Sequence, residues 1–191
     1  AHAGSTVVVV LPGELLDGAD LGRVTRDLAL LAMLGVKPVA VFGARPQVDA
    51  ALRSAGIEPP VEGGWRVTDA KASAVLTAAC GSLLMDLFGA FSSHEPGAPR
   101  PVTGRRAVRV STGNYVFAKP RGVVDGVDFK RTGLVRRVDG SRLDGALAHA
   151  DVLLLPPLGF ALTGEVFNLR AEAVGAAVAA SVGASKLIIL T

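Results

Sequence analysis

Residues 156–172 read PPLGFALTGEVFNLRAE and connect two apolar segments of the chain. The preceding run, residues 152–155, is wholly apolar, as expected for a parallel strand covered on both faces. The following run is rich in alanine and predicts a buried helix. In an open α/β sheet, ligands bind where strands end and helices begin. The pair Asn168 and Glu172, one helical turn apart by spacing, is therefore a candidate part of a binding site.

Segments with strand and helix character alternate along most of the chain. Apolar runs at residues 6–11, 39–42 and 186–190 predict further parallel strands. Helical segments separate the strands, so we expect an α/β three-layer sandwich with a mainly parallel central sheet and helices on both faces. The expected helices cover about residues 20–34, 45–55, 70–91 and 169–182, with a short helix from residue 141.

The period changes to two after residue 106. The segments AVRVS (107–111), NYVFAK (114–119) and residues 134–138 predict a β-hairpin insertion. Many basic residues follow these strands. We interpret them as a solvated face rather than a nucleic-acid surface, because few aromatic residues lie among them. Residues 92–105, rich in Pro, Gly and Ser, predict a loop.

Polar residues indicate where the expected helices begin. Asp20 is a candidate N-cap for the first helix, and Thr68 or Asp69 for the helix near residue 70. Ser141 is a candidate cap for the short helix, with Asp144 three positions later in the style of a capping box.

Composition indicates one domain without a membrane span. The chain has 191 residues, half of them hydrophobic, and lacks an unbroken apolar stretch of about 20 residues. Its net charge of +3 is mild and does not demand a nucleic-acid partner. The single cysteine, Cys80, excludes an internal disulfide, and its apolar neighbours predict a core position. The three histidines are too far apart for metal-ligand spacing, so we expect no metal site.

Two arginines are candidate binding residues. Gly43, Ala44 and Arg45 follow a predicted strand and open a predicted helix, which makes a possible anion site. An ordinary turn with a solvated arginine is the alternative. Arg66 follows Trp65, and a guanidinium beside an apolar ring suits a carboxylate clamp. A surface arginine packed on the tryptophan is the alternative here.

Four motifs follow one another along the chain: GARPQ (43–47), RVTD (66–69), GVVDGVDF (122–129) and TGEVFN (163–168). Together they resemble the amino-acid kinase family, in the branch that holds N-acetylglutamate kinase and N-acetylglutamate synthase. GARPQ is similar to the synthases, because kinases usually carry a glycine triplet there. The resemblance covers essentially the whole chain. It implies the amino-acid kinase or carbamate kinase-like fold, with residues 1–191 forming the substrate-pocket lobe and the start of the nucleotide-lobe-like half, truncated at the C-terminus.

For a synthase, the resemblance implies a regulatory domain that responds to L-arginine and builds a homo-oligomer, either a dimer or a hexamer. In the family, a separate domain transfers acetyl from acetyl-CoA to L-glutamate and so makes N-acetyl-L-glutamate for arginine biosynthesis. That acetyltransferase domain is expected after residue 191, and no cofactor is expected in this chain. The resemblance implies a plastid stroma or a bacterial cytoplasm as the compartment.

The resemblance also implies that kinase activity is lost. Val10 stands where kinases of this fold place a lysine, and Pro12 removes an amide donor that a phosphate cradle would use. Phe42, where relatives often have histidine, is expected to make the pocket mouth apolar. Glu172 stands where the family keeps an acid that organises the phosphate-clamping lysines. A remnant acylamino-acid pocket, structural or weakly binding, would retain Gly43, Ala44, Arg45, Arg66 and Asn168.

Two other functions are compatible with the same motifs. An active N-acetylglutamate kinase would transfer phosphate from ATP to N-acetyl-L-glutamate. Val10, which stands where such kinases place a lysine, argues against this alternative. A stand-alone effector-binding module would lack the acetyltransferase domain.

Overall fold

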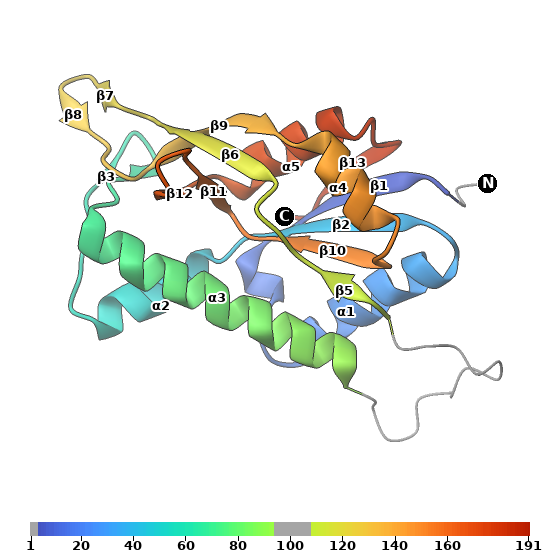
Figure 1. The fold of residues 1–191 in the computed structure, drawn as a ribbon. Helices are drawn as coiled ribbons and strands as arrows, with labels where there is room; N and C mark the ends of the chain where they lie inside the picture. Colours follow the sequence, from blue (N-terminus) through green and yellow to red (C-terminus); the bar gives the residue numbers. More distant parts are fainter. Residues whose placement is uncertain (1–3, 94–107) are drawn as a thin grey trace.

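The computed structural model describes residues 4–93 and 108–191, and its central feature is a five-stranded sheet (Figure 1). The strand order is β13-β1-β2-β10-β5, and every neighbouring pair is parallel. The prediction of an α/β fold with a mainly parallel sheet is therefore confirmed. The strands are β1 (Thr6–Leu11), β2 (Lys37–Phe42), β5 (Val110–Ser111), β10 (Val152–Leu155) and β13 (Lys186–Ile189).

Helices cover both faces of the sheet (Figure 1). On one face lie α1 (Gly18–Met33), α2 (Arg45–Ser54) and α3 (Ala70–Ser92). On the other lie α4 (Gly140–Leu147), α5 (Ala171–Ser181) and a second, smaller sheet. A single 3₁₀ turn, η1 (Gly13–Leu15), follows β1.

The two core layers explain why the sheet strands are continuously apolar. In β1, Val7, Val9 and Leu11 pack with the α1–α3 layer, whereas Val8 and Val10 pack with the α5 layer. Side chains alternate between the faces of a strand, so a strand covered on both sides needs an apolar residue at every position. Each fully buried valine or leucine contributes about 1.5–3 kcal/mol.

The second sheet has the order β12-β11-β6-β9. Antiparallel β6 (Val116–Pro120) and β9 (Gly133–Val138) form the predicted hairpin insertion, here called the ribbon. Its tip is the small hairpin of β7 (Val123–Val124) and β8 (Val127–Asp128), closed by Asp125 and Gly126 at positive φ. The remaining strands, β11 (Leu158–Phe160) and β12 (Val166–Asn168), form an antiparallel hairpin inside residues 156–172 that the sequence did not predict.

The described part of the segment AVRVS, residues 108–111, does not belong to the ribbon as predicted. Its last two residues form β5, an edge strand that pairs in parallel with β10. Arg109 fixes this pairing: its guanidinium binds the Asp151 carboxylate at 2.8 Å, and its carbonyl accepts from the Asp151 N–H at 2.7 Å. The Asp151 contacts raise the pKa of Arg109 further above its ordinary value. Within the described part of this segment, only Val110 and Ser111 form a strand, and it belongs to the parallel sheet rather than to the ribbon.

Two predicted helix caps are wrong and one alternative is confirmed. Asp17, not Asp20, caps α1, because its carboxylate accepts from the next backbone N–H at 2.8 Å. Asp139 caps α4 in place of Ser141, accepting a backbone N–H at 3.2 Å. Asp69 caps α3 with a bond of 2.8 Å. The predicted loop at residues 92–105 lies outside the described residues from residue 94 onward.

Helix α3 is long and apolar enough to cross a membrane by length and composition, which the sequence analysis did not expect. Such a helix is also typical of a protein core. Here one face of α3, with Leu76, Cys80, Leu83 and Leu87, is buried against the sheet and its neighbouring helices. These contacts explain the apolar composition of that face.

Helix α5 approaches β1 closely at Gly175. A Cβ atom at this position would lie 2.3 Å from Cγ2 of Val10, so only glycine fits. We expect Gly175→Ala to lower the free energy of unfolding by about 1–3 kcal/mol, because overpacking outweighs the higher helix propensity of alanine. Urea denaturation followed by circular dichroism measures this loss.

The matched control is Gly89→Ala on α3, where no atom lies within 4 Å of the added Cβ. That variant should be neutral or more stable by up to about 1 kcal/mol. Val10→Ala should recover part of the loss in the Gly175→Ala background. Equal stability of the two alanine variants would contradict the close approach.

Candidate functional site

A cleft of about 720 Å³ lies at the carboxyl ends of the parallel strands. Its lining includes the end of β1 and residues that follow β2, β10 and β13. This is the edge of an open α/β sheet where ligands are expected. The structure brings together seven positions singled out from the sequence for this site: Val10, Gly43, Ala44, Arg45, Arg66, Asn168 and Glu172.

The turns after β1 and β2 pack against each other at the floor of the cleft. A Cβ on Gly13 would lie 2.7 Å from Cδ of Pro46, so the absence of a side chain permits this contact. The Gln47 amide donates to the Gly13 carbonyl at 2.8 Å and holds η1 against α2. Arg45 is exposed at the first residue of α2, where the backbone N–H groups of a helix attract anions. The predicted anion site has this geometry.

A chain of hydrogen bonds connects Asn168 to Arg66 through two buried hydroxyls. The Asn168 side-chain amide donates to Thr68 Oγ1 at 3.2 Å, and Thr68 Oγ1 lies 2.8 Å from Thr132 Oγ1. The Thr132 hydroxyl donates to the carbonyl of Arg66. A carbonyl can only accept, so Thr68 must donate to Thr132 and accept from Asn168. This chain, here called the hydroxyl relay, fixes the side-chain amide of Asn168.

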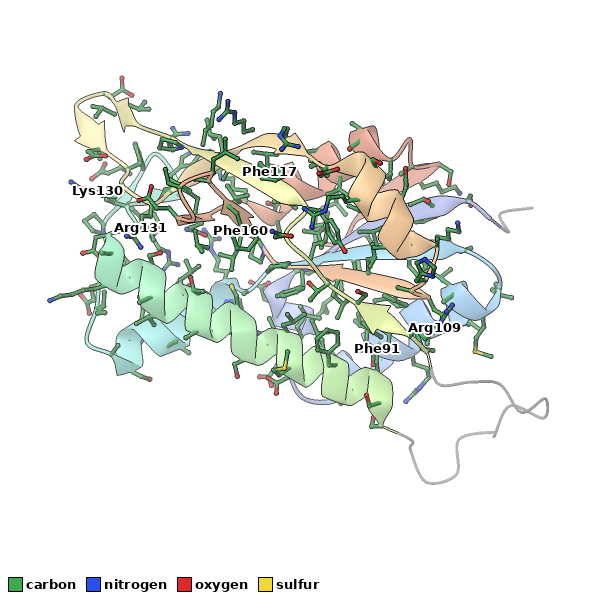
Figure 2. All side chains as sticks on the ribbon, in the orientation of Figure 1. Phe91, Arg109, Phe117, Lys130, Arg131 and Phe160 are labelled. Carbon is green, nitrogen blue, oxygen red and sulfur yellow. The ribbon has the colours of Figure 1, made fainter. Side chains whose placement is uncertain are left out.

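The relay lies where the ribbon meets the first turn of α3. Figure 2 shows Lys130 and Arg131 at this meeting point. The Arg131 N–H donates to the Thr68 carbonyl at 2.8 Å, and the Arg131 carbonyl accepts the Asn168 N–H at 2.9 Å. Backbone and side-chain bonds therefore hold β12, the ribbon and the start of α3 together.

Arg66 lies on β4 (Trp65–Arg66), which pairs with β3 (Val61–Glu62) in a short hairpin. Its guanidinium forms an ion pair with Asp49 of α2. The Arg66 side chain is 17% exposed and that of Asp49 is 41% exposed. Arg66 therefore faces the cleft as predicted, but its charge is offset by a carboxylate that the sequence analysis did not foresee.

Trp65 is held between two guanidinium groups. Arg170 stacks on its ring with a distance of 3.7 Å to the centroid, and Arg121 stacks at 4.1 Å. Arg121 also lies 4.7 Å from the ring of Phe129. Arg170 donates to the Gly64 carbonyl at 3.0 Å. These contacts connect the β3–β4 hairpin to the ribbon and to the residue that precedes α5.

Three expectations about the cleft need correction or refinement. Asn168 ends strand β12 and Glu172 lies in the first turn of α5, so they are not one helical turn apart on a single helix. Phe42 does not reach the pocket mouth, because strand alternation buries it completely in the α1–α3 layer. The third expectation concerns Val10, which stands at the kinase lysine position. Its side chain lines the cleft but is only 2% exposed, because it packs against Gly175.

Cys80 also lines the cleft but is not poised as a nucleophile. The residue is 1% exposed, and burial raises the pKa of its thiol from 9.0 to about 12. A thiolate is the reactive form of cysteine, so the thiol is inert near neutral pH. Within residues 4–93 and 108–191, no group of three His, Cys, Asp or Glu side chains could hold a metal ion.

Comparison with protein families matches residues 5–191 to the amino acid kinase family. The chain belongs to the amino acid kinase family. Among curated proteins, it is 40% identical over 189 residues to an amino-acid acetyltransferase from Pseudomonas fluorescens SBW25 and 38% identical over 188 residues to one from Photobacterium profundum. The matches cover 99% and 98% of this chain. The chain spans less than half of these relatives, 43% and 42% of their lengths.

Solved structures of this family show the same fold. N-acetylglutamate synthase from Neisseria gonorrhoeae, complexed with coenzyme A and L-arginine, superimposes with a TM-score of 0.87 at 32% identity. The same enzyme with coenzyme A and N-acetyl-glutamate superimposes with a TM-score of 0.86 at 30% identity. Both alignments cover the whole chain, and they cover 44% and 42% of the neighbour.

Sequence reasoning missed several residues of the cleft. The hydrogen bond between Thr68 and Thr132 could not be predicted from a motif, because the two residues lie 64 positions apart in the sequence. Arg170 lies between Asn168 and Glu172 in residues 156–172. Its positive charge beside these two residues was the feature that could have identified it as part of the site. Its contact with the carbonyl of Gly64 spans 106 positions and could not be read from spacing.

The hydroxyl relay predicts a specific loss of stability. Thr132→Val keeps the shape of a buried residue but leaves the Thr68 hydroxyl and the Arg66 carbonyl without their partner. The free energy of unfolding should fall by about 1–3 kcal/mol. The exposed Thr163→Val is the control and should change it by less than about 0.5 kcal/mol. Urea denaturation compares the two, and equal effects would contradict the relay.

Proposed function

We propose that this chain is the regulatory, kinase-inactive domain of an amino-acid acetyltransferase that makes N-acetyl-L-glutamate from acetyl-CoA and L-glutamate. The observation that carries the proposal is the match of 40% identity over 99% of the chain to amino-acid acetyltransferases. The acetyltransferase domain would follow residue 191, as the sequence analysis expects. A stand-alone effector-binding module is the alternative.

The chemistry of the cleft supports the absence of kinase activity. Transfer of a phosphoryl group depends on positioned cations and amide donors around the phosphate oxygens. The cations that line the cleft within the described residues are Arg45, Arg66 and Arg170, and no lysine is among them. Val10 occupies the position where the resemblance implies a lysine. Losing one preorganised donor costs about two to three orders of magnitude in rate.

The same cleft retains a cation suited to a carboxylate and oxygen acceptors suited to an N–H group of an amino acid or acylamino acid. Asn168 has a carbonyl oxygen with no hydrogen-bond partner among the described residues, while the relay holds its amide nitrogen. Arg45 lies at a helix N-terminus. Glu172 is exposed in the first turn of α5 and forms no ion pair in the described part of the chain. We propose weak binding of L-glutamate or N-acetyl-L-glutamate here, with Gly43 and Ala44 forming the adjoining wall.

The partners and compartment follow from the same relatives. L-arginine is the proposed effector, because a similar synthase was solved with L-arginine bound. Acetyl-CoA would be a substrate of the downstream domain rather than a ligand of this cleft. The relatives named above are bacterial, which supports a bacterial cytoplasm rather than a plastid. A homo-oligomer, either a dimer or a hexamer, is proposed from the family resemblance.

The rate of coenzyme A thiol release by the full-length protein tests this proposal. Given acetyl-CoA, we expect release only when L-glutamate is present, and we expect L-arginine to change its rate. A release rate that L-arginine does not change would indicate that this domain is a scaffold without a regulatory role. No glutamate-dependent release would overturn the proposed acetyltransferase.

The kinase alternative has its own control in the same preparation. Mg-ATP and N-acetyl-L-glutamate should yield no ADP above the background of ATP alone, because no lysine lines the cleft among the described residues. Steady ADP release that requires N-acetyl-L-glutamate would instead establish an active N-acetylglutamate kinase.

A further inference from the structure

The second sheet has one face packed on the core and one face turned outward. Val116 and Ala118 of β6 pack in the α5 layer, so Phe117 between them points to the outer face. Phe117 is paired directly with Phe160 of β11 and with Arg137 of β9, and directly paired residues share a face of a sheet. Figure 2 shows Phe117 and Phe160 on these neighbouring strands. The outer face therefore carries two aromatic side chains with an arginine next to them.

A hollow of about 110 Å³, here called the ribbon hollow, opens on this outer face. Its lining residues are Phe117, Ala118, Arg136, Arg137, Phe160 and Leu162. Leu162 is 80% exposed, and both phenylalanines are half-buried. Pockets for small molecules usually exceed about 300 Å³, so this hollow suits a single aliphatic side chain of a polypeptide.

The charge of the ribbon hollow is positive, because its two charged residues are arginines. Arg136 is exposed and forms no ion pair within the described residues. The Arg137 side chain is 54% exposed and lies 4.0 Å from the Asp139 carboxylate, a distance at which a surface ion pair contributes little. The hollow therefore combines an apolar lining with cations that an incoming carboxylate can approach.

Residues 58–62, here called the acidic knob, carry the complementary pattern. Val61 is 61% exposed and lies between Glu58 and Glu62, which are exposed and form no ion pair in the described part of the chain. Two prolines precede Val61 and restrict the backbone, and the carbonyl of the second accepts a backbone N–H at 2.7 Å. An apolar side chain with carboxylates on both sides is thus held in a defined position.

Other exposed apolar side chains match the hollow less well. Met85 of α3 is 57% exposed, but the one acid beside it in the sequence is Asp86. Leu30 of α1 is 52% exposed, but that helix carries charges of both signs. Val61 has a carboxylate on each side and no basic residue within four positions. The acidic knob is therefore the better complement of the ribbon hollow in both shape and charge.

Three other occupants fit the ribbon hollow less well than an acidic polypeptide segment. Two copies stacked outer face to outer face would oppose Arg136 and Arg137 to the same arginines, and like charges repel. Nucleic-acid bases stack on free aromatic faces, but the Arg137 guanidinium already covers the Phe117 ring at 3.8 Å. A lipid surface favours side chains that protrude from a protein, whereas these residues enclose a hollow.

We propose that the acidic knob of one copy of this chain docks in the ribbon hollow of a second copy. Val61 enters the hollow, and the two glutamates face Arg136 and Arg137. Knob and hollow are different surfaces, so the contact closes either as a two-fold pair with two such contacts or as a ring. The inference rests on the homo-oligomer of the proposed function and deepens it, but it does not depend on the reaction that the full-length protein catalyses.

Sedimentation velocity of the full-length protein tests this contact with two charge-reversed variants. One carries Glu58→Arg and Glu62→Arg in the knob. The other carries Arg136→Glu and Arg137→Glu in the hollow. Each variant alone should associate at least about tenfold more weakly than the wild type, because its knob and hollow then carry the same sign of charge. An equimolar mixture should regain association, because each surface then meets its complement on the other variant.

The apolar part of the contact has its own variants. Val61→Ser and Leu162→Ser remove exposed side chains, so circular dichroism melts should match the wild type while association weakens about threefold to tenfold. Val123→Ser is the matched control, because this residue is 68% exposed at the ribbon tip, outside both surfaces. Lys37→Glu is the charge control, because this residue is exposed at the start of β2. Neither control should change association.

Four outcomes would overturn the inference. The first is a wild type that remains monomeric at about 100 µM, a concentration at which small interfaces associate. The second is reversed variants that associate as the wild type does, and the third is a mixture of the two that fails to regain association. The fourth is a monomeric wild type that sediments with anionic phospholipid vesicles, which would assign the hollow to a lipid surface.

Sedimentation does not depend on acetyl transfer, so failure of this inference is distinct from failure of the proposed function. A protein without glutamate-dependent release of coenzyme A thiol could still show the knob and hollow contact. Conversely, glutamate-dependent release by a protein whose reversed variants associate normally would overturn this inference alone.

Discussion

Parallel pairing of β1, β2 and β10 is the constraint on which the rest of the structure depends. Parallel strands place their carboxyl ends at one edge of a sheet, so the turns after these strands must meet there. That meeting creates the cleft, and it forces close contacts such as the one between Gly13 and Pro46. Because both faces of the sheet are covered, the buried positions of its central strands are all apolar.

The cleft separates two kinds of chemistry that the amino acid kinase fold can combine. On the β1 side, Val10 and Pro12 leave neither a lysine nor a full set of amide donors for a phosphate. On the β12 and β4 side, Asn168, held by the hydroxyl relay, and Arg170 form a polar wall. We propose that a domain with only the second half binds an amino-acid ligand without turning it over. This property is compatible with a regulatory role.

The sequence predicted the layers of the fold better than the details of the site. Long apolar runs such as residues 152–155 have only one stable place in an α/β protein, so the sheet and its parallel direction were accessible. The placement of β5 was not, because a period of two identifies a strand without naming its partner. Short β11 and β12 were missed because the residues around Gly159 carry no strong alternating pattern.

The site was predicted through local motifs, and the missing parts depend on contacts between distant segments. Gly43–Arg45, Arg66 and Asn168 were found from the turns and motifs that contain them. The pairing of Arg66 with Asp49 changes what that arginine can do, and no spacing rule predicts it. The same is true of Arg170, which becomes a positioned cation only because Trp65 folds against it.

Hydrogen–deuterium exchange of the full-length protein tests most directly whether the carboxylate half of the cleft is retained and the phosphate half is lost. We predict that millimolar N-acetyl-L-glutamate slows exchange in residues 64–70 and 166–173, and that Mg-ATP leaves residues 9–15 unchanged. Protection of residues 9–15 by Mg-ATP, or no protection of residues 166–173 by N-acetyl-L-glutamate, would contradict this account.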